Sequence, residues 1–229
     1  MAKKKLQHFA EVETFSNVFQ HMQRGPELED LPLKGKWNEE YFKNNNPIVL
    51  EVGCGKGEYT IGLAERFPEK NFIGADLKGA RIWRGSKTAL ENNMKNVAFL
   101  RVRIEQIEKM FAKGEISEIW ITFPDPQPQE KREKKRLTSP RFIAKYKNIL
   151  SPEGKINLKT DSEFFYNYTL EVIKQSNYKL LESTNNLYDH ARTMAYSEEL
   201  ESLLNIKTYY EQKFTAKGFN ICYAKFEIC

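Results

Sequence analysis

A glycine-rich turn follows a short apolar run near residue 50. The run is Ile48-Val-Leu-Glu-Val52, and Gly53, Gly55 and Gly57 come directly after it, ahead of a helical pattern. A strand that enters a helix through closely spaced glycines places unpaired backbone N–H groups beside a cavity, because glycine has no Cβ and tolerates positive φ. The turn therefore predicts a pocket for a nucleotide-type ligand.

Two carboxylates indicate which ligand this turn binds. A dinucleotide site has the pattern G-x-G-x-x-G, but Glu58 occupies the position of the third glycine and Glu51 lies inside the end of the strand. An acid there repels a pyrophosphate and suits a cofactor with positive charge, such as the ammonium and sulfonium of S-adenosylmethionine. The next predicted strand ends in Asp76, where a carboxylate can accept hydrogen bonds from both ribose hydroxyls. The turn and Asp76 together resemble the class I S-adenosylmethionine-dependent methyltransferases.

A second candidate site lies at the end of a later strand, where Asp125 stands between Pro124 and Pro126. Because proline fixes φ, this carboxylate has little freedom to turn away. A basic run begins six residues later and holds a single acid, Glu133. Its cations are Lys131, Arg132, Lys134, Lys135, Arg136, Arg141, Lys145 and Lys147. A run of this charge beside a candidate reactive group predicts a phosphate-bearing partner.

Strands and helices that alternate along the chain predict an α/β fold, with a mostly parallel sheet and helices on both faces. The expected strands are 48–53, 71–76, 97–102, 118–122, 155–159, 178–182 and 219–226, and the expected helices are 57–67, 78–93, 104–112, 139–149, 162–175 and 207–217. Five candidate residues fall at or just past the carboxyl end of a strand, where parallel sheets bind their ligands. They are Glu51, Asp76, Arg103, Asp125 and Asp161.

The remaining composition favours one domain with appendages, because 229 residues with 40% hydrophobic content can bury one sizeable core. Residues 1–46 are expected to form a partly ordered N-terminal arm without its own core, ahead of a methyltransferase domain over 47–229. Trp83 and Trp120 lie on apolar faces and are expected in that core. No apolar run approaches the ~18 residues of a membrane span, and no signal peptide is recognisable, so a cytoplasmic location is expected. The scattered cysteines and histidines predict no structural metal.

Four motifs, in their order and approximate spacing, resemble the bacterial tRNA (guanine-N7-)-methyltransferase family. They are Glu51-Val-Gly-Cys-Gly-Lys-Gly57, Phe123-Pro-Asp-Pro-x-Pro128 with Lys134-Lys-Arg-Leu-Thr138, Lys159-Thr-Asp161 and Thr208-Tyr-Tyr-Glu211. The resemblance implies transfer of a methyl group from S-adenosylmethionine to N7 of a guanine in tRNA, in the variable loop. It also implies a Rossmann-like class I methyltransferase fold with a seven-stranded sheet.

The resemblance assigns roles to individual residues, with Asp125 between the cofactor and the target base as the principal catalytic contact. The residues implied in cofactor binding are Glu51, Gly53, Gly55, Gly57, Asp76, Arg103 and Asp125. The residues implied in substrate binding are Gln129, Asp161, Thr208, Tyr209, Tyr210 and Glu211. The residues expected to contact tRNA phosphates are Lys131, Arg132, Lys134, Lys135 and Arg136. The sequence departs from the family at Arg103, where an acid is common, and at Gln127 and Gln129, where tryptophan and lysine are common. Gln129 can donate hydrogen bonds but brings no charge.

The implied chemistry requires placement more than proton transfer. Guanine N7 has a lone pair and carries no proton, so methyl transfer needs no general base. The base becomes cationic as the methyl group arrives, and a fixed carboxylate stabilises that charge most in the transition state. N7 faces a major groove that is too deep and narrow to enter in A-form RNA, so the target guanine is expected in a loop or drawn out of its stack.

Other interpretations stay open at this point. A methyltransferase of a small molecule or a protein would keep the pocket of Glu51 and Asp76, but it would leave the basic run without a role. A non-catalytic RNA-binding module would retain the fold and bind RNA without any dependence on S-adenosylmethionine. A dehydrogenase is disfavoured by Glu51 and Glu58. The sequence indicates no obligatory protein partner.

Overall fold

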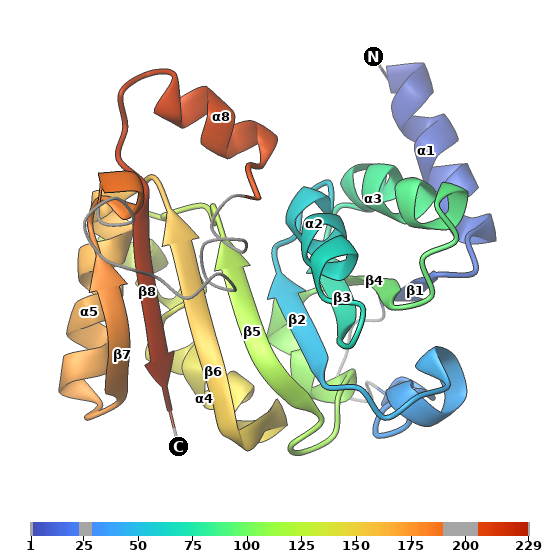
Figure 1. Ribbon diagram of the computed structural model, residues 1–229, viewed down its shortest axis with the longest axis horizontal. Helices are drawn as coiled ribbons and strands as arrows, with labels where there is room; N and C mark the ends of the chain where they lie inside the picture. Colours follow the sequence, from blue (N-terminus) through green and yellow to red (C-terminus); the bar gives the residue numbers. More distant parts are fainter. Residues whose placement is uncertain (1, 23–28, 190–205, 229) are drawn as a thin grey trace.

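In the part of the chain that the structure describes, eight strands form one sheet with helices on both faces (Figure 1). The computed structural model describes residues 2–22, 29–189 and 206–228. The strands are β1 (Val18–His21), β2 (Ile48–Val52), β3 (Asn71–Asp76), β4 (Val97–Val102), β5 (Ile116–Thr122), β6 (Leu150–Thr160), β7 (Lys179–Thr184) and β8 (Cys222–Glu227). The α-helices are α1 (Ala2–Thr14), α2 (Glu58–Arg66), α3 (Gly79–Glu91), α4 (Pro140–Ile149), α5 (Glu163–Gln175) and α8 (Tyr209–Thr215). Shorter helical turns are η1 (Trp37–Phe42), η2 (Ile104–Lys109) and η3 (Glu130–Lys135).

The strand order is β1-β4-β3-β2-β5-β6-β8-β7, and β8 runs antiparallel to both of its neighbours while the other pairs are parallel. Along the chain, β2, β3 and β4 follow one another toward one edge of the sheet, whereas β5 and β6 follow one another toward the other edge. A crevice is therefore expected outside the carboxyl ends of β2 and β5, where this direction changes. Figure 1 shows α8 beyond the carboxyl end of β6, at the same edge of the sheet. Within the described ranges no helix is long and apolar enough to cross a bilayer, and no three metal-ligating side chains gather at one place.

Side chains along the central strands point alternately to the two faces of the sheet, and both faces are buried. Leu50 packs in one core with residues of α4 and α5, and Val49 packs in a second core with residues of α2 and α3. In β5, Trp120 belongs to the same core as Val49. Because successive strand residues point to opposite faces, Glu51 and Thr122 share the α2 side with Val49 and Trp120. This parity brings a carboxylate and a hydroxyl together beneath the glycine turn.

The predicted mostly parallel α/β arrangement is confirmed, with one strand more than the seven expected. The additional strand, β1, pairs with β4 in parallel, so that Val18 lies opposite Phe99. The segment expected as a helix over 104–112 is instead the short 3-10 turn η2. The strand expected at 155–159 begins at Leu150, because its first residues pair with the start of β5 at Ile116.

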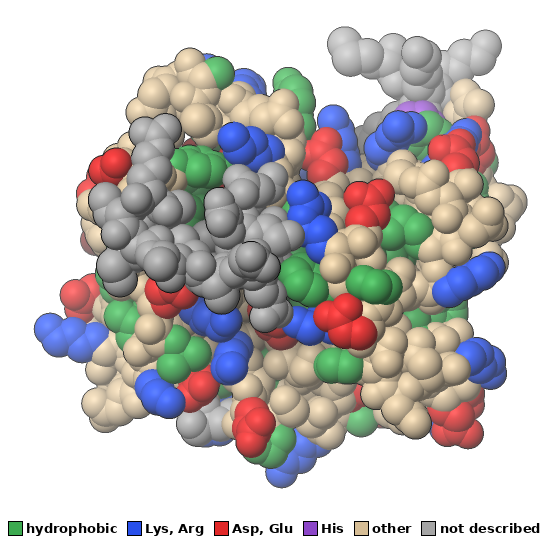
Figure 2. All heavy atoms as spheres, viewed as in Figure 1, with side chains coloured by type: hydrophobic (Ala, Val, Ile, Leu, Met, Phe, Trp, Pro, Cys, Tyr) green, Lys and Arg blue, Asp and Glu red, His purple; other side chains and the backbone are tan. Residues whose placement is uncertain are grey.

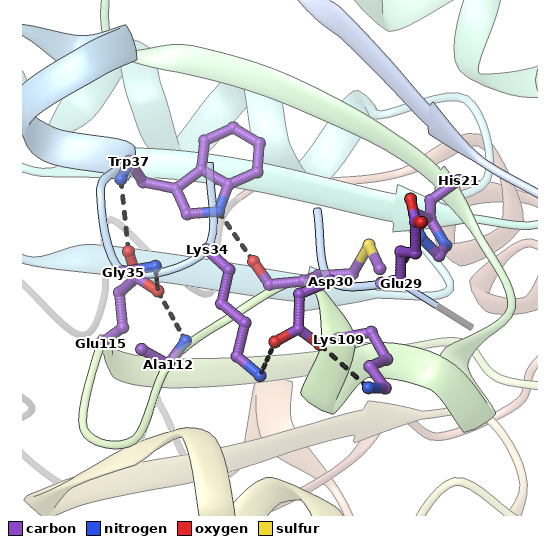
Figure 3. A network of polar contacts seen from close by, with 10 residues as sticks. His21, Glu29, Asp30, Lys34, Gly35, Trp37, Lys109, Ala112 and Glu115 are labelled. Carbon is purple, nitrogen blue, oxygen red and sulfur yellow. Dashed lines mark hydrogen bonds and ion pairs between the residues drawn. The ribbon is translucent and has the colours of Figure 1, made fainter. Parts of the chain in front are cut away.

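The segment before β2 is fastened to the turn between η2 and β5 (Figure 3). The Glu115 carboxylate accepts hydrogen bonds from the backbone N–H groups of Gly35 at 2.9 Å and Trp37 at 3.3 Å. The indole N–H of Trp37 donates to the carbonyl of Met110 at 3.0 Å. Trp37 is fully buried in the same core as the sheet strands. This part of the N-terminal segment therefore shares the core of the sheet.

Trp83, which was expected in the core, is half-buried where α3 meets α1. Its ring stacks on His8 with a centroid distance of 3.7 Å, and its indole N–H donates to the Glu11 carboxylate at 2.7 Å. The prediction failed because the apolar face of α3 extends to cover a second helix as well as the sheet. Trp120 is buried, as predicted.

Candidate active site

The turn between β2 and α2 takes the left-handed backbone conformation at its glycines. The φ angle is 78° at Gly53, 58° at Gly55 and 73° at Gly57. A Cβ on Gly57 would lie 2.5 Å from the ring of Phe99, so close packing requires glycine there. A Cβ on Gly55 would meet no described atom within 4 Å, so the space in front of this residue is open. The turn therefore leaves room for a ligand to approach its backbone.

The carboxylate of Glu51 is buried beneath this turn and held by two threonines. Its Oε2 accepts hydrogen bonds from the backbone N–H of Thr60 at 2.9 Å and from the Thr60 hydroxyl. Its Oε1 accepts a hydrogen bond from the Thr122 hydroxyl. Burial raises the pKa of Glu51 to about 7, against the opposing effect of these hydrogen bonds, and the charge of Asp76 adds to the rise. A cation bound in front of this carboxyl group would favour its ionised form.

Asp76 is fixed at the end of β3 by two backbone N–H groups. Its Oδ2 accepts from Gly55 at 3.0 Å, and its Oδ1 accepts from Lys78 at 2.7 Å. Each oxygen keeps a further lone pair, which is available to hydroxyl donors such as those of a ribose. Arg103 follows β4 along the same edge of the sheet and is half-buried. Its Nε is buried without a hydrogen-bond partner among the described residues.

A cavity opens between the glycine turn, the end of β5 and α8, and is hereafter called the cofactor cavity. It is lined by Glu51, Gly53, Cys54, Gly55, Lys56, Glu58, Arg81, Thr122, Phe123, Thr208, Tyr209 and Tyr210. The Glu51 carboxylate and the cationic side chains of Lys56 and Arg81 border the same space. Because the cavity offers partners to both an ammonium and a carboxylate, it fits the amino-acid end of S-adenosylmethionine.

The loop that carries Asp125 is held in an unusual backbone conformation. Phe123 and Gln127 have φ angles of 47° and 46°, which non-glycine residues rarely adopt and which cluster at functional sites. The backbone N–H of Phe123 donates to the carbonyl of Lys159 at 2.8 Å, which ties the start of the loop to β6. Asp125 itself is exposed, and its Oδ1 accepts from the backbone N–H of Gln127 at 3.2 Å. The carboxylate is therefore oriented by its own loop and open to a ligand.

A second cavity of about 630 Å³ lies on the other side of this loop. It is lined by Pro126, Asp161, Ser162, Glu163, Asn185, Gly218, Phe219, Asn220 and Cys222. Burial raises the pKa of the half-buried Asp161. Phe123 lines the cofactor cavity and Pro126 lines the second cavity, so the loop that carries Asp125 borders both cavities.

The start of α8 brings together the predicted residues of the Thr-Tyr-Tyr-Glu motif but buries the last of them. Thr208 caps the helix, and its hydroxyl accepts from the backbone N–H of Glu211 at 3.2 Å. Glu211 is fully buried and pairs with the equally buried Lys159 at 2.9 Å, and the hydroxyl of Tyr188 donates to the same carboxylate oxygen. Tyr209 is exposed, and its backbone N–H donates to Glu58 at 2.8 Å. Glu211 thus fastens α8 to β6.

Comparison with known proteins identifies the family to which this chain belongs. The family described as "Putative methyltransferase" matches residues 45–224. The tRNA (guanine-N(7)-)-methyltransferase of Christiangramia forsetii is 50% identical over 229 residues, with 99% of each chain covered. The tRNA (guanine-N(7)-)-methyltransferase of Bacteroides thetaiotaomicron is 46% identical over 228 residues, with 100% of this chain and 87% of that protein covered. The chain belongs to the tRNA (guanine-N(7)-)-methyltransferase family.

Solved structures agree with this family at the level of the fold. The 16S rRNA methyltransferase KamB superposes with a TM-score of 0.61 at 14% identity, and the match covers 83% of this chain and 91% of KamB. Geranyl diphosphate C-methyltransferase from Streptomyces coelicolor A3(2), solved with S-adenosyl-L-homocysteine, gives a TM-score of 0.53 at 12% identity over 96% of this chain and 79% of that chain. The predicted class I fold is confirmed. S-adenosylmethionine, when bound in the cofactor cavity, would supply an electrophilic methyl group on a sulfonium.

The basic run of this chain has both exposed and buried members. Lys131, Arg132, Lys134 and Lys135 are exposed on η3, and Gln129 is exposed just before it.

Arg136, by contrast, is only 5% exposed. Its Nε donates to the carbonyl of Gln127 at 3.1 Å and its Nη2 donates to the carbonyl of Pro128 at 3.4 Å. Its guanidinium also lies over the rings of Phe164 at 4.8 Å and Tyr168 at 4.3 Å. The structure therefore places Arg136 against the loop of Asp125 rather than at the surface.

Sequence reasoning missed the groups that hold the functional carboxylates. Thr60 and Thr122 fix Glu51, and Lys159 fixes Glu211. Thr122 could have been found from strand parity, because a threonine at the end of β5 faces the same side as Glu51 in the neighbouring strand. Lys159 gives no comparable signal, since lysine is rarely buried and its partner lies in a distant helix.

Proposed function

We propose that this chain transfers a methyl group from S-adenosylmethionine to N7 of a guanine in the variable loop of tRNA, in the cytoplasm. The observation that carries the proposal is the loop of Asp125, which borders the cofactor cavity through Phe123 and a second cavity of about 630 Å³ through Pro126. Support for tRNA as the substrate comes from the curated relatives that share 46–50% of the sequence.

The cofactor is assigned to the residues of the glycine turn and the neighbouring strand ends. Glu51 would accept from its ammonium, Lys56 and Arg81 would pair with its carboxylate, and Asp76 would accept from the ribose hydroxyls. The backbone at Gly53, Gly55 and Gly57 would lie against it. Arg103, on the next strand along the sheet, is assigned to the adenine end.

The acceptor guanine is assigned to the space beside Asp125. N7 needs no deprotonation, so the contribution of the chain is to hold the lone pair in line with the methyl carbon. As N7 gains the methyl group, positive charge develops on the base, and the exposed Asp125 carboxylate stabilises it. Asp161, in the second cavity, would hold the base or its sugar.

The RNA is assigned to the surface around the two cavities. Lys131, Arg132, Lys134 and Lys135 would contact phosphates, which gives affinity without sequence choice. Gln129, Thr208, Tyr209 and Tyr210 would contact the substrate closer to the reacting base. Glu211 and Arg136 are assigned as positioning residues instead, because one is fully buried beneath α8 and the other is buried against the Asp125 loop.

The test is methyl transfer from labelled S-adenosylmethionine to an unmodified tRNA transcript, followed by borohydride reduction and aniline cleavage, which cuts at N7-methylguanosine. Wild-type protein is expected to produce one cut, in the variable loop. Asp125→Asn is expected to lower kcat by about 100-fold or more while tRNA affinity stays unchanged. Glu153→Gln, which changes an exposed acid at the start of β6, serves as the matched control. Label that enters RNA without creating a cleavable site would refute the N7 assignment.

A further inference from the structure

Four aromatic rings follow one another along α8 and the turn after it. Tyr209, Tyr210 and Phe219 are 53%, 42% and 52% exposed, which is unusual for large rings. The centroid distances are 5.6 Å from Tyr209 to Tyr210, 6.4 Å from Tyr210 to Phe214 and 6.0 Å from Phe214 to Phe219. These four residues, hereafter the aromatic row, form a continuous series of ring contacts in which Phe214 is half-buried and the other three rings are exposed.

The aromatic row joins the two cavities of the candidate active site. Tyr209 and Tyr210 line the cofactor cavity, and Phe219 lines the second cavity together with Asp161 and Pro126. Whatever lies on the row therefore also lies beside the loop that carries the reactive carboxylate. The row is continuous with the substrate site rather than a separate patch.

Hydrogen bonds and a buried ion pair fix the aromatic row in place. The backbone N–H of Tyr209 donates to Glu58 of α2 at 2.8 Å, and the buried pair beneath α8 fastens the helix to β6. At the other end, Gly218 turns the chain with a φ of 81°, and the backbone N–H of Phe219 donates to the carbonyl of Phe214 at 3.1 Å. A rigid platform loses little conformational entropy when a ligand stacks on it.

The charge around the row identifies the kind of partner. Lys207, Lys213 and Lys217 are exposed on the same segment, and none of them pairs with an acid among the described residues. The one acid between residues 207 and 220, Glu211, is buried in its ion pair with Lys159. Beside the row, the exposed Glu58 accepts a hydrogen bond from the backbone N–H of Tyr209, and the ammonium of Lys56 lies 4.8 Å from the centroid of the Tyr209 ring. Exposed rings among unpaired cations are the combination that binds single-stranded nucleic acid, with bases on the rings and phosphates on the cations.

We propose that the aromatic row binds unpaired bases of the tRNA loop next to the target guanine. This inference rests on the proposed function and adds the surface that presents the guanine to Asp125. Phe219 would stack on a neighbouring base in the second cavity, where the exposed amides of Asn185 and Asn220 offer donors and acceptors to the edge of that base.

The test compares Phe219→Ala, Phe219→Leu and Phe219→Trp for binding of unmodified tRNA in the full chain with S-adenosylmethionine present. Loss of the ring is expected to raise the Kd for tRNA between about 5-fold and about 150-fold in both the alanine and the leucine variants. The tryptophan variant is expected to bind as tightly as wild type. Leu180→Ala, which removes a similarly exposed side chain from β7, is the matched control and is expected to leave the Kd unchanged.

A tRNA with 2-aminopurine beside the target guanine gives a second readout. Stacking on Phe219 is expected to quench its fluorescence in the wild-type complex and to quench it less with the leucine variant. If leucine supports wild-type affinity and quenching, the ring has no stacking role and the inference is wrong. If the wild-type chain methylates tRNA while every Phe219 variant binds normally, this inference fails and the proposed function stands. If the wild-type chain transfers no methyl group to tRNA, the proposed function fails first.

Discussion

Replacing Lys159 with methionine removes one half of an ion pair that lies entirely within the protein. The ammonium and the Glu211 carboxylate are 2.9 Å apart, and neither side chain has any exposed surface. Lys159 also donates to the carbonyl of Ile206 at 3.3 Å and lies 5.4 Å from the ring centroid of Tyr59. Burial lowers the pKa of Lys159, and the charge of Glu211 opposes that shift, so the ammonium depends on its partner. Removal of either partner leaves the other charge fully buried without its counter-ion.

Breaking a buried pair costs about 3–5 kcal/mol, because the remaining charge must stay desolvated or be neutralised. For a chain of this size we expect the melting temperature of Lys159→Met to fall by about 6–20 °C. Glu211→Leu alone should lose a similar amount. The double variant removes both charges and should lose about 1–3 kcal/mol less than the sum of the single losses.

The assay is urea unfolding at constant pH, in which a change of midpoint at constant slope reports the free energy of unfolding. Lys179→Met is the control, because the pair of Lys179 with Glu227 is 3.1 Å long but its lysine side chain is 70% exposed. Exposed pairs contribute about 0–1 kcal/mol. The reasoning would be refuted if Lys159→Met lost no more stability than this control, or if the two single losses simply added.

Three further predictions concern the candidate site and its RNA surface. Burial holds the pKa of Glu51 at about 7 in the folded chain against 4.5 normally, so the stability that its neutral form contributes is complete below pH 4.5 and is lost as the pH rises through 7. In cofactor-free protein, the free energy of unfolding of Glu51→Gln relative to wild type should therefore rise by up to about 3 kcal/mol between pH 5 and pH 8. If urea unfolding gave a difference between the two proteins that stayed constant over this pH range, the prediction would be contradicted. Arg136→Lys should lower kcat for tRNA methylation by about 10- to 100-fold, because the Asp125 loop loses the hydrogen bonds of the guanidinium. The same variant should leave the salt dependence of tRNA binding unchanged, and a flatter salt dependence would make Arg136 a phosphate contact instead. Lys131→Gln and Lys134→Gln should each reduce the slope of log affinity against log salt by about 0.7–0.9, whereas Lys113→Gln, which changes an exposed lysine in the turn between η2 and β5, should not. Equal slopes for all three variants would remove η3 from the RNA surface.

The strands and the glycine turn could be predicted because their signals are local. Runs such as Ile48-Val-Leu show the buried strands, and the spacing of Gly53, Gly55 and Gly57 shows the turn. β1 could not be predicted in the same way, since Val18–His21 is four residues long and is stabilised by its pairing with β4, far along the chain. Its sequence alone has no long alternation that would distinguish it from a loop.

The candidate site shows the same division between local and non-local information. Glu51, Asp76 and Asp125 could be placed at strand ends from their positions in the sequence, and the structure puts them at the same edge of the sheet. A basic run, however, does not reveal which of its members is buried. Arg136 is covered because Phe164 and Tyr168 of α5 pack over it, and that contact depends on how α5 lies beside the loop.

The most direct measurement uses tRNA in which the target guanosine is replaced by 7-deazaguanosine, made by ligation of two RNA halves. This base has a C–H group where guanine has N7, and it keeps the Watson–Crick edge unchanged. The proposed function predicts that the modified tRNA binds as tightly as normal tRNA and accepts no methyl group from labelled S-adenosylmethionine, while the ligated control with guanosine is methylated. Methyl transfer to the 7-deaza tRNA at the normal rate would contradict the assignment of N7 as the acceptor.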